Sequence, residues 1–174
     1  MPNRGRLPRG GGTELTLEKS CGSVGTECAR RFAAFGCRVS GVDVSAEPRA
    51  CFDEMHLTRD LAEVLPLADI LVLTIPLTEQ TRHLISGEML KKMKTGALLV
   101  NIARGAVVDT GALIEALRSG SLGGAVLDVF EEEPLAPDSP LWELENVIIT
   151  PHVSFVGENN GKRLSDLILD HMDI

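Results

Sequence analysis

The stretch ALLVNIARGAVVDTGALIEALRSGSLGGAVLD, residues 97–128, decides the fold of this sequence. It opens with a short apolar run, ALLVN, and closes with another, GAVLD. Between them a segment of helical period starts at Asp109 or Thr110, residue types that cap helices, and stops at Gly120. Two apolar strands joined through a helix form a right-handed crossover, which predicts parallel strands of one sheet.

Similar apolar runs recur on both sides of this unit. The further runs that we expect to be strands are Arg38–Asp43, Ile70–Ile75 and Val147–Ile149. Apolar residues from Val24 to Phe35 repeat at helical spacing, and Gly36 ends that helix. Strands that alternate with helices predict a doubly wound parallel α/β sheet with both faces covered.

Length and composition restrict the class of protein. The 174 residues fit one domain, and no apolar stretch approaches the ~20 residues that cross a bilayer, so no membrane partner is expected. A net charge of −8 without a basic face argues against a nucleic-acid partner. Residues 1–12 hold three Arg and four Gly without an apolar core. They predict a flexible arm rather than a secretory signal, and we expect a cytoplasmic protein.

The four cysteines, Cys21, Cys28, Cys37 and Cys51, form no C-x-x-C pair and have no histidine cluster nearby. This spacing argues against a disulfide scaffold and against a metal site. We expect buried, reduced thiols.

A glycine-rich segment, Ser20-Cys-Gly-Ser-Val-Gly25, follows the first expected strand. It matches G-x-G-x-x-G except that Ser20 stands at the first glycine. Gly22 would let the backbone approach a pyrophosphate, and Gly25 would let the helix pack against the strand. Asp43 ends the next strand, where a carboxylate accepts hydrogen bonds from an adenosine ribose, and this favours NAD over NADP. A glycine-rich turn beside a solvated aspartate is the simpler alternative.

The strand before that loop is irregular. Leu15–Lys19 places Glu18 and Lys19 where a central parallel strand is normally apolar. Either this strand is frayed, or the first twenty residues are not the segment that the rest of the domain was shaped to receive.

A denser set of motifs extends from Ala68 to about Val153. These motifs are ADILVLTIPL from Ala68, TRHLI from Thr81, MKTG from Met93, NIARG from Asn101, VD from Val108, LDVFEEEP from Leu127 and TPH from Thr150. In this order they resemble the D-isomer-specific 2-hydroxyacid dehydrogenases, the family that includes D-lactate and D-3-phosphoglycerate dehydrogenases.

The resemblance implies a Rossmann-type cofactor domain that binds NAD, a homodimer, and oxidation of a D-2-hydroxy acid or reduction of the matching 2-keto acid. In the family this domain is inserted into a substrate domain made from both chain ends. We expect residues 13–156 to form the NAD-binding domain and residues 157–174 to form a C-terminal helix left from the substrate domain. Most of the substrate domain, including its long N-terminal segment, is expected to be missing.

The resemblance assigns catalysis to Arg104, Glu133 and His152, and each residue type fits the chemistry. His152 follows the last expected strand, and histidine is the natural base for the proton of a hydroxyl group. Glu133 could pair with His152 and favour its imidazolium form, and Arg104 offers a planar fork to a carboxylate or alkoxide. Taken alone, each also fits a plainer role: a surface histidine, a salt-bridge arginine, or part of the solvated acidic run Glu131–Glu133.

The same residue-by-residue comparison implies the cofactor contacts. They are Gly22, Ser23, Val24 and Gly25 at the pyrophosphate, Asp43, Ile75 and Pro76 at the adenosine side, and Ile102, Ala103, Arg104, Asp128 and His152 toward the nicotinamide. Asp128 has a second interpretation, in which it caps the loop after its strand.

Two functions are compatible with these residues. The first is an NAD-dependent oxidoreductase domain of this family. The second is a catalytically incompetent relative that binds NAD(H), or only dimerises, without turnover. Ser20, the charged first strand and the missing substrate segment favour the second function.

Overall fold

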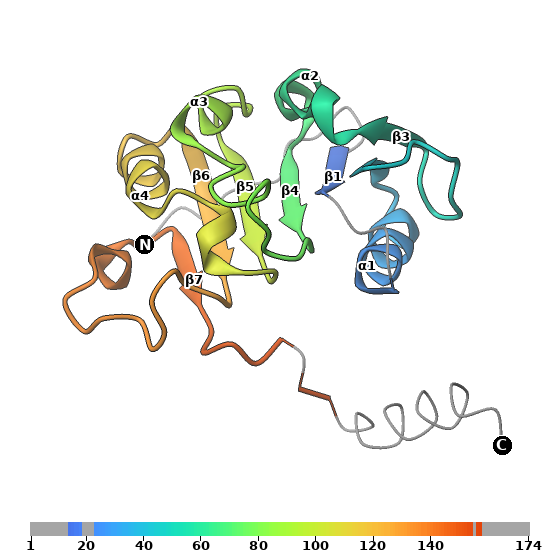
Figure 1. Cartoon of the computed structure of the whole chain (residues 1–174). Coiled ribbons are helices and arrows are strands. Elements are labelled where there is room, and N and C mark those ends of the chain that lie inside the picture. The colour runs from blue at the N-terminus through green and yellow to red at the C-terminus, as the bar shows by residue number, and fades with distance from the viewer. Residues whose placement is uncertain (1–13, 19–22, 155, 158–174) are drawn as a thin grey trace, which may run out of the picture.

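The computed structural model describes residues 14–18, 23–154 and 156–157 of the chain. The expected N-terminal arm, the expected C-terminal helix, Ser20, Cys21 and Gly22 lie outside these residues. The described residues form a seven-stranded sheet in which every neighbouring pair is parallel, in the order β3-β2-β1-β4-β5-β6-β7 (Figure 1). The strands are β1 (Glu14–Glu18), β2 (Arg38–Asp43), β3 (Glu54–Leu57), β4 (Ile70–Leu73), β5 (Ala97–Asn101), β6 (Leu122–Leu127) and β7 (Val147–Ile149).

The helices lie in the crossovers between these strands (Figure 1). They are α1 (Ser23–Ala34), α2 (Leu61–Val64), α3 (Gly87–Leu90) and α4 (Thr110–Arg118), with short 3₁₀ helices at Thr58–Asp60, Leu65–Leu67, Gly105–Val107 and Pro140–Glu143. α4 starts as its sequence predicts, because the Asp109 side chain accepts a hydrogen bond of 3.0 Å from the Ala112 amide.

Two apolar clusters cover the two faces of the sheet, because successive strand residues point to opposite sides. Leu71 and Leu73 of β4 belong to the larger cluster, which includes Leu113 and Leu117 of α4. Val72 belongs to the smaller cluster, which includes Ala29 of α1. The doubly wound arrangement expected from the sequence is therefore present.

Four details differ from the sequence-based expectation. β3 was not expected, because its residues EMHL carry no apolar run; β3 is an edge strand that pairs only with β2. β4 ends two residues earlier than predicted, and β6 begins two residues earlier. β1 pairs with both β2 and β4, so it lies inside the sheet despite its charged sequence. Cys51 is exposed rather than buried, and Cys28 and Cys37 are only partly buried.

No helix in the described part of the chain is long and apolar enough to cross a membrane.

Candidate active site

The three residues expected to act in catalysis follow three neighbouring parallel strands. Arg104 comes after β5, Glu133 after β6 and His152 after β7. The carboxyl ends of parallel strands meet at one edge of a sheet, which is where open α/β sheets bind ligands. The topology therefore brings these three loops to a common edge.

The loop after β5 is shaped by Asn101, the last residue of that strand. Its buried amide oxygen accepts a hydrogen bond of 3.0 Å from the Ala103 N–H, and its amide nitrogen donates one of 3.1 Å to the Arg104 carbonyl. The Arg104 guanidinium donates to the Ala103 carbonyl at 2.6 Å. Asn101 thus fixes the turn from which Arg104 projects.

The loops after β5 and β6 pass in direct backbone contact at Gly105. A Cβ atom on Gly105 would lie 1.8 Å from the carbonyl carbon of Phe130, so only glycine allows this approach. The Phe130 amide in turn donates a hydrogen bond of 2.9 Å to Oε1 of Glu133. The backbone beside Arg104 therefore supports the residue that orients Glu133.

Glu133 and His152 form a hydrogen-bonded pair. Oε2 of Glu133 lies 2.8 Å from Nδ1 of His152, and about a third of each side chain is exposed. Burial raises the pKa of Glu133, but hydrogen bonds from His152 and Phe130, with the charges of His152 and Arg104, outweigh it and hold the pKa below its ordinary value of 4.5. The carboxylate is therefore ionised against the imidazole.

The loop that carries His152 is held by Asp128, at the end of β6. The buried Asp128 carboxylate accepts hydrogen bonds from the Thr150 hydroxyl and, at 2.9 Å each, from the Val153 and Ser154 amides. Burial raises the pKa of Asp128, but hydrogen bonds from the Ser154 and Thr150 side chains and from the Ser154 and Val153 amides hold it far below its ordinary value. His152, with φ at 54°, sits inside this clamp. The loop that Asp128 holds follows β7, whereas the second interpretation had Asp128 cap the loop after its own strand, β6.

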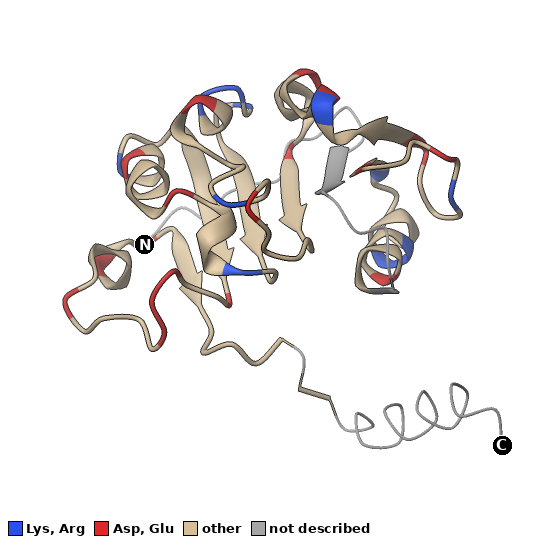
Figure 2. Cartoon of the chain, viewed as in Figure 1, with Lys and Arg blue, Asp and Glu red and all other residues tan. Residues whose placement is uncertain are grey.

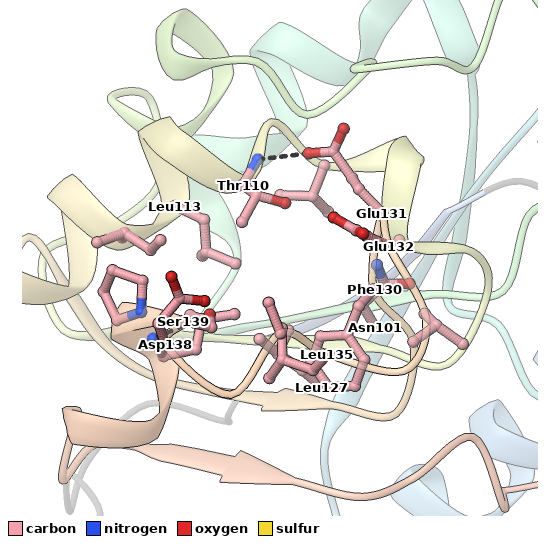
Figure 3. Close-up of a pocket in the computed structure, with 17 residues that line it drawn as sticks. Asn101, Thr110, Leu113, Leu127, Phe130, Glu131, Glu132, Leu135, Asp138 and Ser139 are labelled. Atoms are coloured by element: carbon pink, nitrogen blue, oxygen red, sulfur yellow. Dashed lines mark hydrogen bonds between the residues drawn. The ribbon is translucent and has the colours of Figure 1, made fainter.

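Glu131 belongs to a different arrangement from Glu133. Its carboxylate accepts a hydrogen bond of 3.1 Å from the Thr110 amide at the start of α4 and lies 3.0 Å from Nε2 of His83. Together with Glu132 and Asp138 it borders a cavity of about 360 Å³ whose floor includes Leu127 and other apolar side chains (Figure 3). Neither Arg104 nor His152 lines this cavity. The acidic run Glu131–Glu133 is therefore divided: Glu131 and Glu132 border the cavity, and Glu133 pairs with His152.

The described residues that are expected at the cofactor follow strands of the same sheet. α1 begins at Ser23, after β1, with Val24 exposed and Gly25 buried. β1 lies between β2 and β4, where the strand order reverses, and a helix N-terminus there supplies amide donors and positive potential to a pyrophosphate. The elements present therefore fit a dinucleotide.

Asp43, at the end of β2, is more covered than expected of a ribose-binding carboxylate. Its side chain is 8% exposed; Oδ2 lies 3.1 Å from Nη2 of Arg49, and Oδ1 accepts a hydrogen bond of 2.6 Å from the Val44 amide. Arg49 is a feature that the sequence reasoning missed. A ribose hydroxyl would share this carboxylate with Arg49.

The remaining cofactor positions divide into exposed and buried residues. Pro76 is exposed, and Ile102 is partly exposed. Ile75 is 2% exposed because its side chain packs in the larger apolar cluster, so any contact with adenosine at this position is left to its backbone. Ala103 is buried too, as expected for a residue that presents backbone. Within the described residues no group of His, Cys, Asp and Glu could hold a metal ion.

The family described as "D-isomer specific 2-hydroxyacid dehydrogenase, NAD binding domain" matches residues 19–154. The match covers most of the chain, so this protein belongs to that family. The expected family and the expected Rossmann-type fold are therefore confirmed.

Curated relatives share both sequence and family. An (S)-sulfolactate dehydrogenase from Chromohalobacter salexigens is 44% identical over 87% of this chain and 49% of that protein. A glyoxylate reductase from Thermofilum pendens is 40% identical over 84% of this chain and 43% of that protein. The chain spans about half the length of these relatives.

Solved structures agree with the fold. A probable 2-hydroxyacid dehydrogenase from Rhizobium etli, in complex with NADP, HEPES and L(+)-tartaric acid, has a TM-score of 0.86 and 32% identity, covering 98% of this chain and 55% of that chain. A D-isomer specific 2-hydroxyacid dehydrogenase from Xanthobacter autotrophicus, in complex with NADPH and MES, has a TM-score of 0.75 and 39% identity, covering 81% and 44%.

Proposed function

We propose that this chain is the cofactor half of an oxidoreductase that interconverts a D-2-hydroxy acid and its 2-keto acid with a nicotinamide dinucleotide. The observation that carries the proposal is the 2.8 Å contact between Glu133 and His152 at the ligand-binding edge of a Rossmann-type sheet. A surface histidine needs no such partner, whereas a general acid and base needs a group that orients it. The dyad therefore favours an enzyme over a module that only binds NAD(H) or dimerises.

The reaction balances with one hydride and one proton. In the reductive direction a bound NADH would supply the hydride to C2 of the keto acid, and the His152 imidazolium would donate the proton to the carbonyl oxygen, which gives the 2-hydroxy acid and NAD+. Glu133 stabilises that imidazolium and fixes the ring through Nδ1. His152 recovers its proton from water, and the reverse reaction uses neutral His152 as the base.

Arg104 is proposed to bind the substrate carboxylate. Its guanidinium is near enough to Glu133 to lower the pKa of that carboxyl, which places a positive charge beside the dyad. A planar fork suits a carboxylate better than a point charge does, and it also stabilises a developing alkoxide. Arg104 would exchange its bond to the Ala103 carbonyl for bonds to substrate.

NAD is proposed as the preferred cofactor because Asp43 stands where a 2′-phosphate would bind. Its ion pair with Arg49 reduces this preference, because the guanidinium offsets part of the repulsion. Gly22, Ser23, Val24 and Gly25 would contact the pyrophosphate, and Ile102 and Ala103 the nicotinamide ribose. Asp128 would act at the nicotinamide end of the site by holding the loop that carries His152. Residues 13–156 would form this NAD-binding domain, between an arm at 1–12 and a C-terminal helix at 157–174.

A homodimer is proposed from the family resemblance, and a cytoplasmic location from the composition of the chain. Light scattering of the purified chain at two concentrations tests the dimer directly, and a mass of one chain at both would overturn it.

The function is tested by titrating the purified chain with NADH and following nicotinamide fluorescence. Saturable binding is expected, and most of it should persist in His152→Ala, because His152 is one of many expected cofactor contacts while its proton transfer acts on the substrate. The 2-keto acid reductase activity of the same chain should disappear in His152→Ala. Failure of the unaltered chain to bind NADH would overturn the proposal.

A further inference from the structure

A second cavity, of about 650 Å³, opens beside the dyad. Two of its lining residues are Glu133 and His152, and the other six are apolar: Phe130, Pro134, Leu135, Trp142, Ile149 and Pro151. These six come from the loop after β6 and from β7 with the residues that follow it. An apolar cavity that ends on a proton-transfer pair is placed to receive part of the molecule that exchanges the proton.

The loop that supplies most of this lining carries only negative charge. The sequence contains no Lys or Arg between Arg118 and Lys162, and the loop between β6 and β7 carries several acidic residues (Figure 2). In the described lining, His152 is the only residue able to carry positive charge, and it is paired with Glu133. Arg104 lies outside this lining and is proposed to hold the substrate carboxylate, so a second anionic group in the cavity would meet the Glu133 carboxylate with no further cation in the lining.

Resting on the proposed function, we propose that this cavity binds the tail of the substrate and that the tail is uncharged and apolar. The substrate class is then 2-keto and 2-hydroxy acids with a branched aliphatic or aromatic tail. Their carboxylate would lie at Arg104, their carbonyl oxygen at His152 and their tail against the six apolar side chains. Tails that end in a sulfonate, phosphate or second carboxylate are disfavoured.

Trp142 reports on this cavity without any substitution. It is the only tryptophan in the sequence, its side chain is about half exposed, and its ring N–H donates a hydrogen bond of 2.9 Å to the Ala136 carbonyl. That bond holds the indole in place, and Trp142 lines the cavity. A tail that covers the ring should change the Trp142 emission.

The experiment is a titration of the 174-residue chain with three keto acids, followed by Trp142 fluorescence, with and without NADH. Pyruvate has a methyl tail, 4-methyl-2-oxopentanoate has three more carbons, and 2-oxoglutarate has a tail of similar size that ends in a carboxylate. Burial of a methylene strengthens binding about fourfold, so 4-methyl-2-oxopentanoate should bind roughly eight- to sixtyfold more tightly than pyruvate. 2-Oxoglutarate should bind no more tightly than pyruvate.

A variant pair tests the same claim by calorimetry. Trp142→Ala should weaken 4-methyl-2-oxopentanoate at least fivefold and leave pyruvate and NADH unchanged. Phe35→Ala removes an even more exposed aromatic side chain away from the cavity and should change none of the three.

The outcomes separate the two proposals. NADH binding without preference for the apolar tail, or with 2-oxoglutarate bound as tightly as 4-methyl-2-oxopentanoate, overturns the cavity assignment and leaves the proposed function standing. Preference for the apolar tail without NADH binding overturns the proposed function and supports the cavity as a binding site.

Discussion

Asp128→Asn should loosen the loop that presents His152 to substrate. The Asp128 carboxylate accepts hydrogen bonds at Oδ1 from Thr150 and Val153 and at Oδ2 from the Ser154 amide, and the Ser154 side chain is a further donor to it. An asparagine of the same shape keeps one oxygen but replaces the other with an NH₂ group that cannot accept a hydrogen bond. The orientation that keeps the hydrogen bonds from Thr150 and Val153 places the amide nitrogen against the Ser154 N–H. Two hydrogen-bond donors then face each other, and the bond from the Ser154 amide is lost.

The size of the effect follows from these contacts. A hydrogen bond to a charged acceptor contributes about 1.5–3 kcal/mol, and a buried donor left without a partner costs about 1–3 kcal/mol. Because the two bonds that survive become neutral, and because a buried charge is removed, we expect the free energy of unfolding to fall by about 2–4 kcal/mol. A displacement of His152 by ~1 Å should lower turnover by roughly 10- to 100-fold.

The pH dependence separates this role from general destabilisation. The pKa of Asp128 is lower in the folded chain than in the unfolded one, so its contribution to stability is complete above about pH 4 and is lost as the pH falls toward the folded pKa. Urea unfolding of Asp128→Asn should therefore show a weaker loss of stability below pH 4 than the unaltered chain.

Asp138→Asn is the matched control. Asp138 is exposed and has no hydrogen bond to any described residue, so its substitution removes one negative charge without breaking a contact. Equal unfolding free energies and equal acid slopes for the two variants would refute the role given to Asp128.

Three further substitutions test the site. Glu133→Gln should lower reductase activity by roughly 10²-fold or more, because His152 loses its charged partner. It should also weaken the loss of stability below about pH 4.5, since the pKa of Glu133 is lowered on folding. An unchanged dependence of urea unfolding on acid pH would count against the pair. Gly105→Ala should destabilise the chain by about 3 kcal/mol or more, because its Cβ would clash with Phe130. The control is Gly111→Ala, whose Cβ meets nothing closer than 3.5 Å and which should stabilise α4 by about 0.5–1 kcal/mol. Similar melting temperatures for the two variants would contradict the close approach at Gly105. Asp43→Ala should weaken NADH and strengthen NADPH in fluorescence titrations, because the repulsive carboxylate is gone and its Arg49 partner stays; a parallel loss for both cofactors would contradict the assignment.

Patterns local in sequence predicted much of the fold. Apolar runs located β2, β5 and β7 to the residue, because a strand covered on both faces must be apolar along its length. The same rule could not find β3, an edge strand that is only partly buried. It also left the place of β1 open, since the charged β1 sequence contradicts its position inside the sheet.

The sequence predicted the parts of the candidate site that lie in motifs. It did not predict the parts that depend on contacts between residues far apart in the chain. The motifs predicted the meeting of Glu133 and His152, and the hydrogen bond between them agrees with that expectation. The clamp at Asp128 depends on residues more than twenty positions further along the chain. The close approach at Gly105 depends on the backbone of Phe130. No local sequence pattern indicates this approach or the hydrogen bonds of Asp128.

Deuterium transfer tests the central claim most directly, because it detects even slow turnover. The purified chain, in excess over NADH carrying deuterium at nicotinamide C4, is incubated with a 2-keto acid, and the 2-hydroxy acid is analysed by mass spectrometry and chiral chromatography. We expect the D-isomer with deuterium at C2, formed well below ~1 per second, because the chain spans about half the length of its relatives and a substrate held by fewer contacts reacts more slowly. The rate should fall at least ~100-fold in His152→Ala. NADH binding without any deuterated product, or equal transfer by His152→Ala, would contradict the account.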